Sequence, residues 1–457
     1  MAITRRDLTG LAVLAATAAS ALPAQAQTSG RRAEVETLRL RAETLHPRGR
    51  EAATSPDWHG RWDALGARAK HLSDGAYFIQ TRQALGWFKD GHTTLQPFDA
   101  ANPPAQLAKG AFSLSLPIGV RVFHDGAYVV SAKDEGAPLL GARITHLGSM
   151  ETAALIRAFA ANWPGSEAWA HRWAASMFAP ALLHGLGAVD DPAAPISLEA
   201  MAGPRSIKAQ LRPSAQGGVD LSALQRKMTE IEIWSAAAGD AARGNFIQRS
   251  AAAIYISCDA LSVDTPTFGA FTRACFAAME DPAPARLIID LRRNGGGNNF
   301  LFEALRKHVE RSRFNRPGAL YVMISPQTFS AAQNATNRLE RETFALFVGE
   351  PSGGSPNHYG DAQCVAGLAT GITANISTLP WFDGYLMDKR LWVSPDLPAP
   401  QVFTDWRDGR DPALTIAMTH AVTAPADEWS QAITFYFGRP SQAADWRPFW
   451  RPFWRQA

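Results

Sequence analysis

The pattern of apolar and polar positions divides the chain into three parts. From 31 to 100, apolar residues recur at helical spacing, which predicts a helical N-terminal domain. From 110 to 215, short alternating runs such as GVRVF and AYVVSA predict strands, with a hairpin turn at Asp125-Gly126 between them. Trp- and Ala-rich stretches inside this part predict a helical insertion. This pattern indicates a small β-rich domain that follows the helical one.

Strands and helices alternate in the third part, from 216 to 425. RLIID and ALYVMIS read as buried strands because their apolar runs are continuous, and each is followed by a helical pattern. Such alternation predicts an α/β core with a parallel or mixed sheet and helices packed on it. Sheets of this kind bind ligands beyond the C-terminal ends of their strands. Two candidate elements fall there, a glycine-rich turn and Ser330.

The glycine-rich turn follows the strand in RLIIDLRRNGGGNN. Gly295, Gly296 and Gly297 let the backbone turn sharply and approach a ligand closely. The free N–H groups of such a turn and of the helix that follows suit an anion or a developing oxyanion. The glycine pattern fits neither a Walker loop nor a dinucleotide fingerprint. A plain tight turn is the alternative that the stretch itself leaves open.

Ser330 lies in ISPQTFSAAQN, between a buried strand and an Ala-rich helix. A nucleophilic serine needs this position, because a strand-to-helix turn exposes Oγ and the helix start offers N–H groups to an oxyanion. Serine is also among the preferred helix N-caps, and this stretch taken alone favours the cap.

Both termini carry distinct signals. Residues 1–26 combine the paired arginines Arg5 and Arg6, a short apolar run and a small-residue site ending at Ala26. They predict a twin-arginine export signal and a periplasmic or otherwise exported protein. The tail, 426–457, contains RPFW twice in succession. We expect an aromatic strap docked on the body, and a peripheral membrane or partner contact is the alternative.

Composition narrows the classes of protein. Hydrophobic residues make up 46% and charged residues 19% of the 457 residues, which allows a large core. The formal net charge of +3 gives no support for nucleic-acid binding. Cys258, Cys275 and Cys364 are widely spaced, and neither they nor the histidines show metal-site spacing. We therefore expect no metal and no other cofactor.

Four motifs together resemble a known family. DGHTT, IIDLRRNGGGNN, TFSAAQN and FVGEPSGG occur in the order and spacing of the C-terminal processing proteases, the tricorn core and the interphotoreceptor retinoid-binding proteins. The resemblance covers 31–414. It implies a ClpP/crotonase-like core, an N-terminal helical domain, a PDZ-like fold for 110–215, and a peptide or protein substrate. It also implies Ser330 as nucleophile, with Gly295, Gly296 and the Ala331 N–H as the oxyanion hole.

The resemblance points to the tricorn-like branch for the base. Processing proteases of the family use a lysine just after the VGE segment, where this chain has Gly354 or Ser355. The tricorn-like branch instead uses a histidine from a distant N-terminal motif. DGHTT supplies His92, with Thr93 beside it as an orienting hydroxyl, and a neutral imidazole suits proton transfer from serine near pH 7. Catalysis requires Ser330 Oγ within about 3 Å of a His92 nitrogen, or somewhat farther away in a ligand-free form.

The sequence does not single out the third catalytic residue. Asp388 lies close to the place of the family's glutamate, and Glu350 is a second candidate. His358 follows a glycine-rich loop and lines the pocket or is an ordinary loop residue. The sequence thus predicts an exported serine-type peptidase that works through an acyl-enzyme. The alternative is a catalytically inactive relative that binds a ligand or peptide in the cell envelope. Cleavage preference and oligomeric state are left undetermined.

Overall fold

The computed structural model shows a mixed α/β fold, which confirms the predicted class. It describes residues 30–96, 110–215, 221–238, 244–262, 264–366, 368, 370–385 and 387–421. The predicted export signal and the RPFW repeat lie outside the described residues. No helix in the described ranges is long and apolar enough to cross a membrane.

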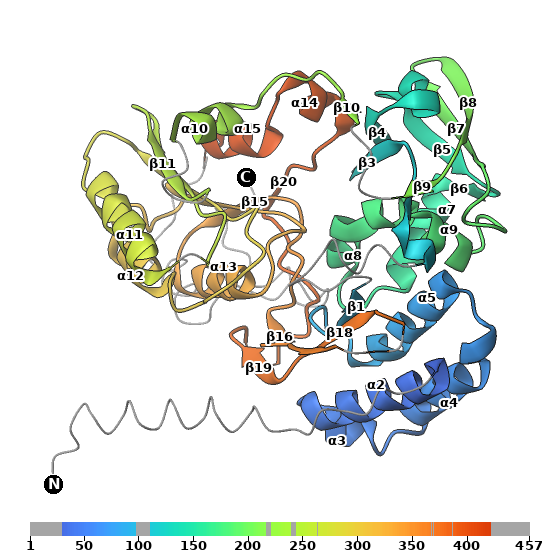
Figure 1. Cartoon of the computed structure of the whole chain (residues 1–457). Coiled ribbons are helices and arrows are strands. Elements are labelled where there is room, and N and C mark those ends of the chain that lie inside the picture. Colours follow the sequence, from blue (N-terminus) through green and yellow to red (C-terminus); the bar gives the residue numbers. More distant parts are fainter. Residues whose placement is uncertain are drawn as a thin grey trace, which may run out of the picture.

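A six-stranded sheet forms the centre of the C-terminal part (Figure 1). Its strands run parallel except β11, which is antiparallel to β12. Their order is β11 (Phe246–Arg249), β12 (Ala253–Ser257), β13 (Arg286–Asp290), β14 (Leu320–Ile324), β15 (Leu346–Gly349) and β20 (Leu397–Pro398). Every residue of β12, β14 and β15 is buried, as expected of strands covered on both faces. The strands predicted at RLIID and ALYVMIS are confirmed.

Helices cover both faces of this sheet. Alternate strand residues point to opposite faces, so Ile254 and Ile256 pack with one set of helices and Tyr255 with the other. The first set is α11 (Thr265–Met279), α12 (Glu303–Arg311) and α13 (Ala331–Glu342), and the second is α10 (Glu230–Ala238) and α15 (Pro412–Thr419). The loops at the strand ends are therefore held between two helical layers.

The N-terminal helices and the β-rich part share one hydrophobic core. The helices are α2 (Arg31–Leu45), α3 (Gly49–Ala52), α4 (Pro56–Arg68) and α5 (Asp74–Leu85). The β-rich part has the order β10-β4-β5-β7-β8, with β3 on β4 and β6 on β5. These strands are β3 (Ile118–Phe123), β4 (Gly126–Ala132), β5 (Arg143–Leu147), β6 (Met150–Glu151), β7 (Ile196–Ala202), β8 (Arg205–Leu211) and β10 (Ser222–Ala223). The predicted hairpin at Asp125-Gly126 is confirmed as β3–β4. A PDZ-like fold for this part stays a prediction.

Helices α8 (Glu167–Trp173) and α9 (Pro180–Gly185) lie in the Trp- and Ala-rich stretch, and α7 (Thr152–Ala161) precedes them. That this stretch is an insertion stays a prediction. A short pair, β2 (Leu114–Ser115) and β9 (Ser214–Ala215), closes this part, and α14 (Phe403–Asp408) follows β20.

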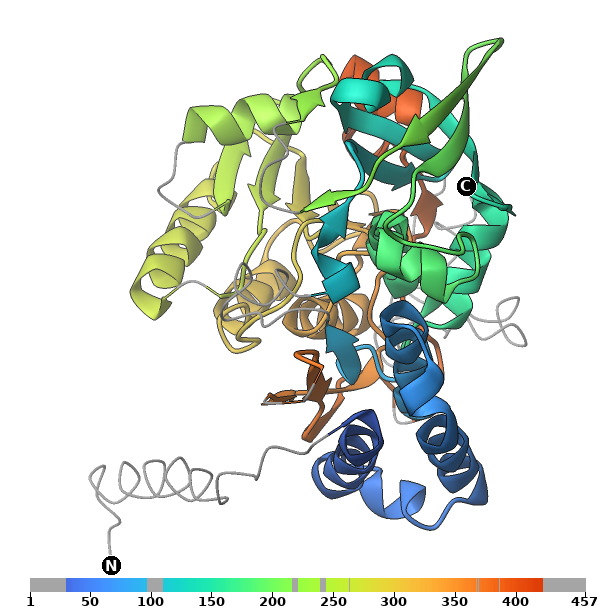
Figure 2. The same ribbon diagram turned by 45° about the vertical axis from the view of Figure 1, so that its right-hand side comes forward.

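A small sheet joins the N-terminal part of the chain to the segment that follows β15. β1 (Thr94–Gln96) pairs with β18 (Thr373–Ile376), which also pairs with β17 (Gln363–Val365). A second pair consists of β16 (Asn357–Gly360) and β19 (Leu379–Phe382). In Figures 1 and 2 the blue N-terminal helices lie at the lower end of the molecule, with β1 next to the orange β18. This pairing fixes the DGHTT segment beside the core.

Candidate active site

Ser330 occupies a strained turn between β14 and α13. Its backbone has φ 54 and ψ −126, a conformation uncommon for a residue with a side chain. Ser330 stands at the N-cap position, but its side chain makes no capping hydrogen bond. The cap that the local sequence favours is therefore wrong. The side chain is half-buried. Its Oγ lies at a sharp strand-to-helix turn and does not cap the helix.

Gly296 packs directly against Ser330. A Cβ added at Gly296 would lie 2.5 Å from Ser330 Cβ and 3.1 Å from the Ala331 nitrogen, and its φ of +113 excludes most side chains. Only glycine allows this approach. The Gly296 N–H donates to Asn294 Oδ1 at 2.9 Å. By contrast, a Cβ at Gly295 would meet nothing within 4 Å. The glycine turn, Ser330 and the start of α13 thus meet as the sequence predicts.

His92 lies against the residue that precedes Ser330. Its ring centroid is 4.3 Å from that of Phe329. Both ring nitrogens of His92 are buried and have no hydrogen-bond partner among the described residues, Ser330 included. Unsatisfied buried polar atoms are rare in native proteins and often mark functional groups. Catalytic hydrogen bonds in ligand-free enzymes are commonly long and tighten only with substrate.

An aromatic stack holds Phe329 in place. The Trp169 indole, from α8, stacks on Phe329 with centroids 3.8 Å apart and planes 3° apart. A Cβ at Gly91 would come within 3.0 Å of both rings. Ser166 Oγ, at the start of α8, donates to the Gly353 carbonyl at 2.8 Å. The middle part of the chain therefore forms one wall of the site.

Asp90 is the carboxylate beside His92. Its Oδ1 accepts the His92 backbone N–H at 3.0 Å and lies 3.7 Å from His92 Nδ1. Its Oδ2 accepts from Thr93 Oγ1 at 2.7 Å and from Ser377 Oγ at 2.5 Å. His46 Nε2 lies 3.5 Å from the same oxygen. Thr93 thus orients the carboxylate, whereas the sequence suggested that it orients the histidine.

The surroundings keep Asp90 ionised. Burial alone would raise the pKa of its carboxyl, but polar contacts from His46, His92 and Ser377, with the charge of His92, outweigh burial and hold the pKa well below its usual value. A buried anion therefore stands next to the imidazole at neutral pH. Such an anion stabilises an imidazolium.

His358 stacks near His92 at a ring-centroid distance of 5.6 Å. Its Nδ1 lies 3.0 Å from the Ser355 carbonyl oxygen, which fixes the ring. Burial, with a further effect of the His92 charge, lowers the pKa of His358 to about 4. His358 is therefore neutral at pH 7 and forms part of the wall around His92.

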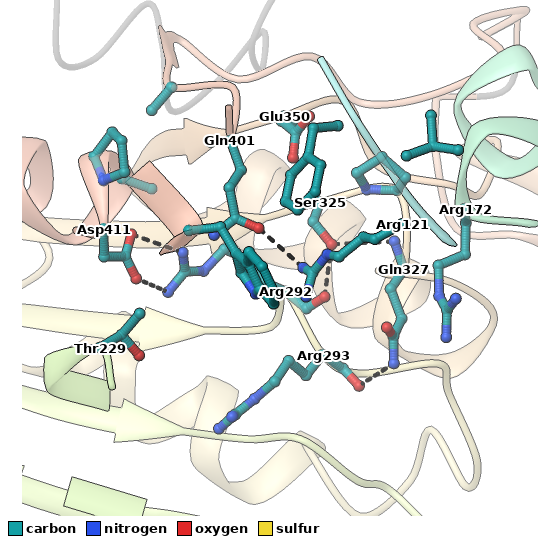
Figure 3. A pocket seen from close by; sticks show the side chains of 18 of the residues that line it. Arg121, Arg172, Thr229, Arg292, Arg293, Ser325, Gln327, Glu350, Gln401 and Asp411 are labelled. Carbon is teal, nitrogen blue, oxygen red and sulfur yellow. Dashed lines mark hydrogen bonds and ion pairs between the residues drawn. The ribbon is translucent and has the colours of Figure 1, made fainter. Parts of the chain in front are cut away.

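Two of the predicted acids lie elsewhere. The Asp388 carboxylate is engaged by Arg390, with Nη2 2.6 Å from Oδ2, and Arg390 also pairs with Glu340 at 2.7 Å. All three side chains are buried, so they form an internal ion-pair network. Glu350 lines a separate cavity beyond the strand ends (Figure 3). Neither Asp388 nor Glu350 forms a hydrogen bond or an ion pair with the His92 ring.

Gly354 and Ser355 occupy the positions where processing proteases of the family are expected to carry the lysine. A Cβ at Gly354 would come within 2.8–3.1 Å of the Gln333 side chain, so this position is filled. Ser355 Oγ donates to the Leu391 carbonyl at 3.2 Å. Lys389, the next lysine after Ser330 in the sequence, is exposed. In the described part of the chain no cluster of histidine, cysteine and acidic residues could hold a metal ion.

Sequence reasoning missed Asp90 and Trp169. Asp90-Gly91 forms a turn, because the Asp90 side chain accepts the N–H of the residue two positions on. The signal that could have identified Asp90 is its place two residues before the candidate base. Nothing in the local pattern distinguishes Trp169 from its neighbouring tryptophans.

The structural comparison confirms the resemblance to the C-terminal processing protease family at the level of the fold. The structure of mature CPAF complexed with lactacystin is 12% identical and has a TM-score of 0.53, covering 83% of this chain and 95% of that one. Mature CPAF is 13% identical, with a TM-score of 0.52 and coverages of 83% and 94%. The photosystem II D1 C-terminal processing protease is 13% identical over 81% and 93%, with a TM-score of 0.35. No family model and no curated protein matches the sequence.

Proposed function

We propose that this protein is a serine-type peptidase that hydrolyses peptide bonds through an acyl-enzyme on Ser330. The observation that carries the proposal is the conformation of Ser330. A positive φ at a residue with a side chain costs about 1–3 kcal/mol and persists where the surrounding structure imposes it. Such strain at a strand-to-helix turn presents a nucleophilic Oγ. The fold shared with CPAF supports the same proposal.

In this proposal His92 is the general base and Asp90 its positioning residue. His92 takes the proton of Ser330 Oγ as Oγ bonds to the substrate carbonyl carbon. The Asp90 carboxylate stabilises the imidazolium that forms, as the acid of a serine triad does. We assign this role to Asp90 because Asp388 is already paired with Arg390. His92 then passes the proton to the leaving amine, and water hydrolyses the acyl ester with His92 as base.

The developing oxyanion needs N–H donors close to Ser330. Ala331 stands at the first position of α13, where the N–H has no partner within the helix. The Gly296 N–H already donates to Asn294. We therefore propose Gly295 and Ala331 as donors, with Gly296 providing the close approach to Ser330.

Labelling with a fluorophosphonate probe tests the proposal directly. We expect the mature wild-type protein to be labelled and Ser330→Ala to be silent. His92→Ala should slow labelling by at least about 100-fold, since it removes the base. His71→Ala is the matched control, because His71 is exposed, and it should label at the wild-type rate. Lactacystin, present in one CPAF structure, should compete with the probe.

The outcomes separate the alternatives. Labelling lost only in Ser330→Ala would keep the hydrolase and remove His92 from its role. Asp90→Asn should slow labelling by at least about tenfold. Such slowing, together with complete loss of labelling in Ser330→Ala, would support Asp90 as the positioning residue. A well-folded wild type that is not labelled would contradict the peptidase and leave the ligand-binding alternative.

We also propose export through the twin-arginine pathway. The basis is the pair Arg5-Arg6 followed by an apolar run and a small-residue site ending at Ala26. Replacing both arginines with lysine should leave the protein in the cytoplasm as an uncleaved precursor. A periplasmic, processed double-lysine variant would contradict this route.

A further inference from the structure

His46 is a buried histidine that has no task in the proposed mechanism. It is the residue at which α2 ends, so it belongs to the N-terminal helices. Only 4% of the residue is exposed, and its side chain has no exposed surface. Burying a polar group is costly unless it has a partner. The contacts of this imidazole therefore indicate its role.

Three contacts hold the ring of His46 in one orientation. The Phe88 ring stacks on it, with centroids 3.8 Å apart and planes at 25°. The Tyr359 ring, from β16, lies at a centroid distance of 4.7 Å and a tilt of 57°. The Arg48 backbone N–H donates to His46 Nδ1 at 3.0 Å. The end of α2, the segment just before Asp90 and the strand β16 thus meet at this imidazole.

The Arg48 bond decides which ring nitrogen carries the proton. Nδ1 accepts a hydrogen bond, so the proton of the neutral imidazole is on Nε2. His46 Nε2 is buried and has no hydrogen-bond partner among the described residues. Asp90 Oδ2 stands 3.5 Å from it. A usual N–H···O bond is about 2.7–3.2 Å long, so a shift of about 0.5 Å would complete this one, as happens in catalytic sites on substrate binding.

The two oxygens of Asp90 have different surroundings. Side-chain donors from three separate parts of the chain converge on Oδ2: Thr93 Oγ1 at 2.7 Å, Ser377 Oγ at 2.5 Å and His46 Nε2 at 3.5 Å. Oδ1 accepts the His92 backbone N–H at 3.0 Å and lies 3.7 Å from His92 Nδ1. Donors on Oδ2 keep the carboxylate from rotating, so Oδ1 stays on the side of the catalytic imidazole.

His46 also supports the charge of this carboxylate. Burial raises the pKa of the Asp90 carboxyl, and the contact with His46 is the largest of the effects that lower it, ahead of His92 and Ser377. A neutral donor stabilises the anion without cancelling its charge. The full charge of Asp90 is therefore left for the imidazolium of His92.

We propose that His46 is a positioning residue of the active site: its Nε2–H holds Asp90 Oδ2, so that Oδ1 stays directed at His92 while His92 takes the proton of Ser330. This inference rests on the proposed peptidase function. The two hydroxyl donors to the same oxygen rotate about single bonds, whereas the His46 ring is fixed by its stacking and by its bond to the backbone. The end of α2 thereby takes part in catalysis.

Two substitutions at His46 separate its two hydrogen bonds. The amide oxygen of asparagine reaches the place of Nδ1, so His46→Asn keeps an acceptor for Arg48 and removes the donor to Asp90. The amide nitrogen of glutamine reaches the place of Nε2, so His46→Gln keeps that donor and gives up the acceptor. Fluorophosphonate labelling over a range of probe concentrations gives the limiting rate, kinact, and the half-saturating concentration, KI.

We expect His46→Asn to lower kinact by about tenfold or more and to leave KI within about twofold, because proton transfer suffers and probe binding does not. His46→Gln should keep kinact within about threefold of wild type. Leu38→Ala is the control for lost stability, since Leu38 is buried in the same helix and makes no hydrogen bond to Asp90. Its kinact in folded protein should equal that of wild type. Thermal melting shows at which temperature each variant is folded.

A double variant tests whether His46 acts through Asp90. Asp90→Ala leaves no carboxylate to hold, so adding His46→Asn should slow labelling by less than about twofold more. If His46→Asn does not fold, His46→Phe takes its place, because it keeps the stacking on Phe88 and lacks both ring nitrogens; the same loss in kinact is expected.

The outcomes keep this inference apart from the catalytic proposal. Wild-type kinact in His46→Asn, equal losses in the Asn and Gln variants, or effects that multiply in the double variant would overturn the role of His46 and leave the peptidase standing. A folded wild type that is not labelled would contradict the peptidase, and the role of His46 with it.

Discussion

Gly296→Ala is the sharpest test of how the backbone builds the site. The new Cβ would lie 2.5 Å from Ser330 Cβ, 3.0 Å from the Phe329 carbonyl oxygen and 3.1 Å from the Ala331 nitrogen. Carbon atoms in contact normally stand about 3.5–4.0 Å apart. The glycine turn and the Ser330 turn must therefore separate by about 1 Å. All three atoms lie in the turn that presents the nucleophile.

The expected cost has two parts. Alanine at a φ of +113 carries about 1–3 kcal/mol of backbone strain. Overpacking against a rigid turn adds about 1–3 kcal/mol, so urea unfolding should show a loss of about 2–6 kcal/mol. A displacement of about 1 Å at a reacting centre costs about 100-fold in rate. We expect the second-order rate of fluorophosphonate labelling to fall by at least that factor in the folded protein.

Gly60→Ala is the control for a glycine outside the site. Gly60 lies in α4, and its Cβ would meet nothing within 4 Å. Its stability should stay within about 1 kcal/mol of wild type, with labelling changed by less than about threefold. Normal labelling in Gly296→Ala, or equal damage in both variants, would refute the role given to the close approach at Gly296.

Three further predictions concern acids, pH and strain. Asp388→Ala should destabilise the protein by about 3–5 kcal/mol, because it leaves Arg390 buried without one of its partners. Fluorophosphonate labelling of the folded fraction should stay at the wild-type rate. A loss of labelling in folded protein would show that Asp388 takes part in catalysis. Folding lowers the pKa of His358 from 6.5 to about 4, so between these pH values the folded protein binds fewer protons than the unfolded chain. The free energy of unfolding should therefore fall by up to about 3 kcal/mol as the pH is lowered from 6.5 to about 4. Urea unfolding at about pH 4.5 and 7.5 should show a smaller pH dependence for His358→Gln than for wild type, and an equal dependence would contradict the neutral, buried state of His358. Ser330→Gly should be about 1 kcal/mol more stable than Ser330→Ala, since glycine relieves the positive φ; equal melting temperatures would mean that the turn is not strained.

Local patterns predicted much of the fold. The continuous apolar runs RLIID and ALYVMIS became β13 and β14, and the Asp-Gly pair became the β3–β4 turn. These features depend on the period of a few neighbouring residues, so a sequence shows them directly. The ends of helices depend on side-chain contacts that this period does not show. α12 begins at Glu303 and not directly after the glycine turn, because Asn298 Oδ1 accepts the Phe300 N–H at 3.0 Å and favours a turn.

The sequence by itself determined the alternating core, the glycine turn and the strand-to-helix position of Ser330. Only the tertiary structure decided which groups surround that serine. The pairing of β1 with β18 brings His92 to Phe329, encloses the Asp90 carboxylate and gives it Ser377 as a donor. The packing of separate elements also forms the cavity that Glu350 lines. Contacts between segments far apart in the chain depend on how whole elements pack, and no local period of apolar residues encodes them.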